Sequence, residues 1–157
     1  MRITLFLFVL IFPLGFVNAQ SFPTTFLGHW KGSLEIYSGS KKTMTISVGL
    51  DVTKTDTAGK YNWVITYGDS NQDIRPYKLV AIDSSKGHWA IDEQNGIIID
   101  MYATGNKVST LFVVMGSSIM ISYWIEKGEM MMELYSFPEK PGITTGKKTE
   151  ESPEVKV

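Results

Sequence analysis

The chain has no cysteine among its 157 residues, so it has neither disulfide bonds nor thiolate chemistry. It has only two histidines, His29 and His88, and these two residues without cysteine make a poor set of zinc ligands. We therefore expect no metal site, no haem and no other cofactor. Arginine is also scarce, with Arg2 and Arg75 alone, and the formal net charge is −1. A nearly neutral chain with so little arginine is a poor binder of phosphate backbones, so we expect no nucleic-acid partner.

The sequence lacks the common catalytic patterns as well. It contains no Gly-x-Ser-x-Gly elbow, phosphate loop or dinucleotide fingerprint. Asp51 and Asp100 each interrupt an apolar strand pattern, and exposure to water is the simplest interpretation of both. An aspartate facing a cavity would instead indicate an enzyme, such as an isomerase or cyclase. We assign no catalytic residue.

The N-terminal segment has the features of a secretory signal peptide. After Met1-Arg2 the chain is almost wholly apolar from Ile3 to Phe12, and Val17-Asn18-Ala19 supplies small residues at the two positions that a signal peptidase reads. The apolar run is too short to span a bilayer comfortably, so we predict cleavage after Ala19 and no membrane span. No cysteine follows for a lipid anchor. The expected location is outside the cell or in a periplasm.

Apolar residues recur at every second position after this segment, which is the period of a β-strand and not of a helix. The clearest strand covers residues 43–53, and similar alternation runs through 61–67, 77–83, 87–93 and 97–103. Three more strands are predicted at 107–115, 118–126 and 129–137. Pro76 is expected at the start of its strand, where a missing N–H is tolerated.

Short turns join these predicted strands. Asn95-Gly96 is typical of a two-residue hairpin with positive φ at both positions, and Gly105-Asn106, Gly116-Ser117 and Lys127-Gly128 follow at similar intervals. Eight or nine strands joined in this way predict an antiparallel meander that closes into a barrel without exposed edges. The barrel domain should cover residues 20–137. Residues 138–157 are rich in proline and charge, which predicts a disordered tail.

Gly28-x-Trp30 at the first strand of such an exported meander resembles the lipocalin and calycin superfamily. The longer run Gly28-His-Trp-Lys-Gly32 is similar to the start of nitrobindin-like barrels. The chain lacks the Thr-Asp-Tyr turn of lipocalins and a late arginine, with Lys127 instead. The resemblance implies an all-β, lipocalin-like up-and-down barrel in which the tryptophan fills the closed end and the lumen carries a small apolar ligand.

Alternation places several aromatic residues on one face of their strands, where they line either a ligand cavity or a filled core. In the run Met130-Met131-Met132, one or two side chains should face inward, and an outward Met131 near Met120, Trp124 or Tyr135 would form an apolar patch. A filled lumen with such a patch would favour a protein-interaction module or homodimer. The predicted lumen residues are Trp30, Tyr61, Trp63, Tyr67, Trp89, Tyr123 and Met132.

Overall fold

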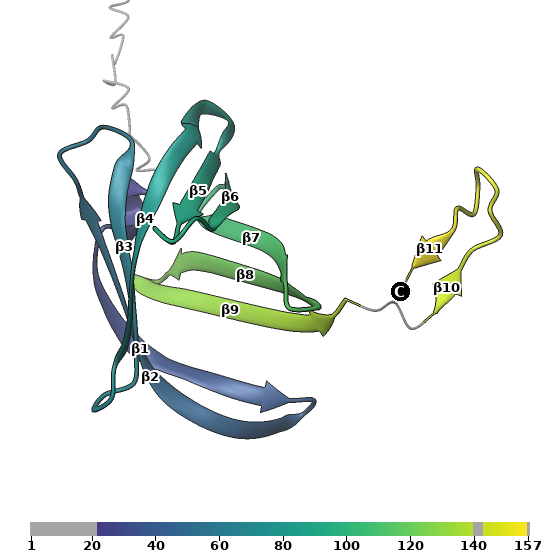
Figure 1. The fold of residues 1–157 in the computed structure, drawn as a ribbon, viewed down its shortest axis with the longest axis horizontal. Helices are drawn as coiled ribbons and strands as arrows, with labels where there is room; N and C mark the ends of the chain where they lie inside the picture. Colours follow the sequence, from purple (N-terminus) through teal and green to yellow (C-terminus); the bar gives the residue numbers. More distant parts are fainter. Residues whose placement is uncertain (1–21, 140–142, 157) are drawn as a thin grey trace, which may run out of the picture.

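The computed structural model describes residues 22–139 and 143–156. Within these residues, nine strands form a single antiparallel sheet in which each strand pairs with its neighbour in the chain. The sheet curls into a nearly closed barrel (Figure 1), so the predicted all-β meander is confirmed. The strands are β1 (Gly28–Ser38), β2 (Lys41–Lys54), β3 (Lys60–Tyr67), β4 (Asp73–Asp83), β5 (His88–Asp92), β6 (Ile98–Thr104), β7 (Lys107–Val114), β8 (Ser117–Glu126) and β9 (Glu129–Pro138).

The register of the sheet decides which side chains face the lumen. Trp30 pairs with Leu50 and Leu50 with Ile65, while Val108 pairs with Tyr123 and Tyr123 with Met132. Because directly paired residues lie on the same face of a sheet and alternate along each strand, these residues define the inner face. Buried apolar side chains belong almost entirely to this face.

One end of the barrel is closed by a turn that precedes the first strand. The short 3-10 turn η1 (Thr24–Phe26) brings the fully buried Phe26 against Phe22, with 5.0 Å between ring centroids. Phe26 also stacks on Trp63 at 6.3 Å, and Phe22 meets Trp89 edge-on at 5.3 Å. These rings belong to one cluster with eight further buried residues, which are Leu50, Val52, Ile65, Leu79, Ile91, Met101, Val108 and Tyr123.

The wall of the barrel is not sealed between the first strand and the last strand, which corrects the expectation of a sheet without edges. Within the described residues, β1 and β9 are the two ends of the strand order and are not paired with each other. The β1–β2 hairpin bends away from β8 and β9 (Figure 1). Pairing the first strand with the last depends on the curvature of the whole sheet, which local alternation does not encode.

Two local predictions also need correction. Pro76 lies within β4 and not at its start, which the sheet tolerates because β5 pairs with β4 only from Lys78 onward. In the turn between β5 and β6, positive φ occurs at Gln94 and Gly96 and not at Asn95. The Asn95 side chain instead accepts a hydrogen bond from the backbone N–H of Ile97 at 3.0 Å.

The two terminal segments were predicted to lie outside the barrel domain. The predicted signal peptide, residues 1–19, lies outside the described residues. In the segment expected to be a disordered tail, β10 (Thr144–Thr145) and β11 (Val155–Lys156) form a small hairpin that stands apart from the barrel (Figure 1). The short 3-10 turn η2 (Ser84–Lys86) joins β4 to β5. None of the helical segments that the structure describes is long and apolar enough to cross a membrane.

Candidate ligand-binding cavity

A large hollow opens between β1, β2 and β9, where the sheet does not close. Its volume is about 560 Å³, within the range of ordinary small-molecule sites. The inner-face side chains around it are mainly aliphatic or thioether groups. Gly32 contributes to the space because it faces inward without a side chain, and a Cβ built on it would touch nothing within 4 Å. The inner-face lining consists of Trp30, Gly32, Leu34, Val48, Leu50, Ile65, Tyr123, Met130 and Met132.

A second hollow of about 110 Å³ is lined by residues from β3 to β8. It shares Ile65 and Tyr123 with the larger hollow, so the two adjoin. Its walls are mostly apolar, but Thr110, Arg75 and Glu93 add polar groups. The lining comprises Trp63, Ile65, Tyr67, Arg75, Tyr77, Ile91, Glu93, Ile99, Met101, Thr110, Phe112, Ile121 and Tyr123.

All seven residues predicted to face the lumen lie on the inner face, but the structure divides them among different surroundings. Trp30, Tyr123 and Met132 line the large hollow, and Trp63, Tyr67 and Tyr123 line the small one. Tyr61 and Trp89 line neither, because they pack against each other at 6.1 Å in the closed end. Whether any of the seven binds a ligand stays a prediction.

The lipocalin resemblance implied that Trp30 fills the closed end. In the structure, Trp30 packs against the buried cluster that includes Phe22 and Phe26. Its side chain is half-buried, and its indole Nε1 donates a hydrogen bond of 2.8 Å to the carbonyl of Phe26. The bond ties the first strand to the η1 turn, and the Phe26 ring takes the buried position. A single turn such as η1 leaves no periodic pattern in the sequence, which is why Phe22 and Phe26 are absent from the prediction.

Several lining residues were not singled out from the sequence. Val48, Leu50 and Ile65 continue the alternation of strands that the sequence identifies, so that pattern contains the signal for them. Arg75 and Thr110 carry no such signal, because a charged or hydroxylated side chain in a half-buried strand is usually taken to face water.

The cationic group of the small hollow, Arg75, is paired with Asp73. Arg75 donates from Nε and Nη2 to one oxygen of Asp73, at 3.0 Å and 2.7 Å, and its guanidinium lies 5.1 Å from the centre of the Tyr67 ring. The hydrogen bond from Arg75 holds the pKa of Asp73 below its usual range. Burial raises the pKa of the Tyr123 phenol well above its usual range, and it also raises the pKa of Tyr67. Both phenols are therefore neutral at physiological pH.

Each of the two histidines pairs with one of the two strand aspartates on the outer face, and the two pairs are separate. His29 Nδ1 lies 2.7 Å from Asp51 Oδ1, and His88 Nε2 lies 2.8 Å from Asp100 Oδ1. His88 also stacks on Tyr102, with 4.8 Å between ring centroids. Among the residues that the structure describes, no three histidine or acidic side chains are grouped as a metal site would require. Asp51 and Asp100 thus face away from the lumen, as the simpler interpretation expected.

Comparisons with known proteins add no assignment, because no protein-family model, no curated protein and no solved structure matches the chain.

Proposed function

We propose that this chain is an exported, lipocalin-like barrel that binds one small apolar molecule in its lumen and performs no chemistry on it. The observation that carries the proposal is the hollow of about 560 Å³ between β1, β2 and β9. Its volume falls in the range of about 300 to 1,000 Å³ that is typical of small-molecule sites. Export rests on the sequence of residues 1–19 alone.

Apolar side chains of the inner face support the proposal because many are not covered. Ile36, Met44, Val114 and Leu134 lie on that face by register, yet their exposed fractions are 37%, 55%, 42% and 44%. These four side chains line neither hollow, but they continue the apolar inner face beyond the hollows. Exposed apolar patches often mark binding sites. A small apolar ligand in the hollow would remove the apolar surface around it from water, at about 25 cal/mol per Å².

Filling the hollow is the sharpest test of this function. Gly32 has ordinary strand geometry and open space beside it, so Gly32→Leu should fold and place four carbon atoms where a ligand would lie. Thr45→Leu, on the exposed outer face of β2, is the matched control. Binding is measured by the fluorescence of N-phenyl-1-naphthylamine, a neutral apolar probe, and by native mass spectrometry of the protein from its own source followed by organic extraction.

The expected result is saturable binding to the wild type and to Thr45→Leu, with at least about tenfold weaker binding to Gly32→Leu. Tenfold corresponds to about 1.4 kcal/mol, less than the contribution of one well-buried aliphatic group. Equal binding by all three proteins would place the probe elsewhere and contradict the proposal. The absence of both probe binding and a co-purifying molecule would also contradict it.

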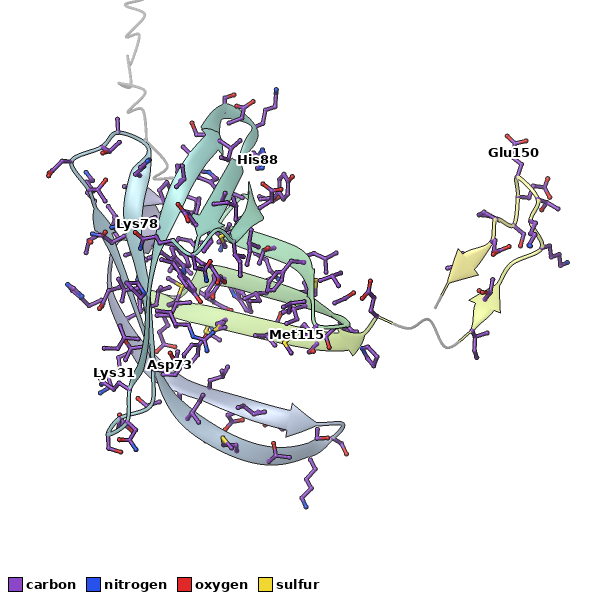
Figure 2. All side chains as sticks on the ribbon, viewed as in Figure 1. Lys31, Asp73, Lys78, His88, Met115 and Glu150 are labelled. Carbon is purple, nitrogen blue, oxygen red and sulfur yellow. The ribbon has the colours of Figure 1, made fainter. Side chains whose placement is uncertain are left out.

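A second candidate function, a protein-interaction or homodimerising module, is favoured by an apolar patch on the outer face of β7 to β9. Leu111, Met120 and Tyr135 lie side by side across the three strands, and Phe137 stacks on Tyr135 at 6.1 Å. Met115, at the tip of the β7–β8 turn, is fully exposed (Figure 2). Sedimentation velocity decides this candidate: a dimer that Tyr135→Lys dissociates would support it, and a monomer at all concentrations would exclude a homodimer.

A further inference from the structure

Thr110 carries a buried hydroxyl that has no hydrogen-bond partner. The residue lies on the inner face of β7 and is only 6% exposed, and its Oγ1 is the sole buried side-chain polar atom without a partner among the described residues. Buried polar groups in native proteins nearly always have a partner, so each exception requires an explanation. Because Thr110 lines the small hollow, its missing partner is expected there.

The nearest neighbours of this hydroxyl across the sheet are uncharged. Ile121 is the direct neighbour of Thr110 across β7 and β8, and the other nearby walls are largely aliphatic or aromatic. Tyr123, which borders both hollows, adds a neutral phenol. In such surroundings a charged group would lose its hydration without gaining a counter-charge, whereas a neutral hydroxyl or carbonyl loses much less.

The charges of the small hollow do not favour an anion either. Arg75 is the one cationic residue that lines it, and its guanidinium is already bonded twice to Asp73. Glu93 is the one carboxylate among the lining residues, in addition to the Asp73 carboxylate that is bound to Arg75. A carboxylate head group would therefore compete with Asp73 for the guanidinium and be repelled by Glu93.

We propose that the ligand is a neutral, mainly apolar molecule that carries one hydroxyl or carbonyl group, and that this group forms a hydrogen bond with Thr110 Oγ1. Its apolar part then passes Ile65 and Tyr123 into the larger hollow beside β1 and β9. The inference rests on the proposed function, since it specifies what the lumen selects. It excludes fatty acids as the preferred class and favours alcohols, aldehydes or ketones of similar length.

Competition between two ligands that differ only in their head group tests the inference. Decan-1-ol and decanoate each displace N-phenyl-1-naphthylamine from the full protein at pH 7.5. Thr110→Val replaces the hydroxyl by a methyl group of similar shape, and Thr110→Ala removes the same hydroxyl with a smaller side chain. Thr110→Ser retains the hydroxyl, and Thr66→Val makes the same change on the outer face of β3.

Decan-1-ol should displace the probe from three proteins, the wild type, Thr110→Ser and Thr66→Val, at a concentration at least about tenfold lower than the concentration of decanoate that is needed. The difference is expected because decan-1-ol forms one hydrogen bond and brings no charge into the hollow. In Thr110→Val and Thr110→Ala, the affinity for decan-1-ol should weaken by about fivefold, with each value corrected for the affinity of the probe measured in the same variant. Equal competition by decanoate, or an unchanged affinity for decan-1-ol in both hydroxyl-free variants, would overturn the inference and leave the apolar site intact. Failure of the probe to bind the wild type would instead overturn the proposed function, and this inference with it.

Discussion

Replacing Phe26 with alanine should destabilise the barrel more than any surface change, because its ring closes one end of the lumen. The side chain is 0% exposed, and its ring centroid lies 5.0 Å from that of Phe22 and 6.3 Å from that of Trp63. An aromatic side chain buries about 150 to 250 Å², which corresponds to about 4 to 6 kcal/mol of transfer free energy. The alanine Cβ retains part of this and the cavity relaxes only partly, so we expect a loss of about 3 to 5 kcal/mol.

Urea unfolding followed by tryptophan fluorescence measures this loss as a lower midpoint at an unchanged slope. Phe137→Ala is the matched control, since it deletes the same ring from a site on the outer face that is 53% exposed. Its expected cost is below about 1 kcal/mol. A loss below about 1 kcal/mol for Phe26→Ala would show that η1 does not close the barrel and would refute the packing argument.

Three further perturbations follow from single contacts. Burial raises the pKa of Tyr123, so above about pH 10 the unfolded chain loses a proton that the folded protein keeps. The free energy of unfolding should therefore fall by up to about 1.4 kcal/mol per pH unit. Urea titrations at pH 9 to 11 should show a smaller slope for Tyr123→Phe than for the wild type. Gly87→Ala should lower the free energy of unfolding by more than 2 kcal/mol in thermal unfolding, because φ is 71° and the new Cβ would lie 2.5 Å from the carbonyl oxygen of Ala103. Gly105→Ala is the control, since φ is 62° there and a Cβ would have open space, and it should cost only about 1 kcal/mol. A similar cost for both glycines would contradict the close approach. Trp30→Phe should lose about 1 kcal/mol in urea unfolding, since it removes the indole hydrogen bond to the η1 turn, and no loss would show that this bond contributes nothing.

Local alternation in the sequence predicted the strands and grouped the residues that share a face, whereas the register of the sheet decides which of the two faces is the inner one. Trp63 and Tyr67 face inward together because side chains alternate strictly along a strand, and the same rule places Met130 and Met132 inward and Met131 outward. The rule gives no information on which inner residues pack tightly and which border empty space. Tyr61 and Trp89 satisfied the pattern as well as Trp30 did, yet only Trp30 lines a hollow. That difference depends on η1, a single turn whose buried rings have no periodic signal.

The open seam between β1 and β9 raises the question of how two free strand edges avoid pairing with other molecules. Exposed edges are a common route to aggregation, and charged side chains along them are a common protection. Lys31 points outward from β1 (Figure 2), and Glu35 lies on the same outer face. Glu129 and Glu133 occupy the outer face of β9. Charged residues thus stand on the outer side of each edge, although β9 also carries Tyr135 and Phe137 there. On the inner side, Leu34, Met130 and Met132 are apolar. The charges disfavour strand addition at the seam, and the apolar inner side leaves the route into the lumen that the proposed binding of a small apolar molecule would require.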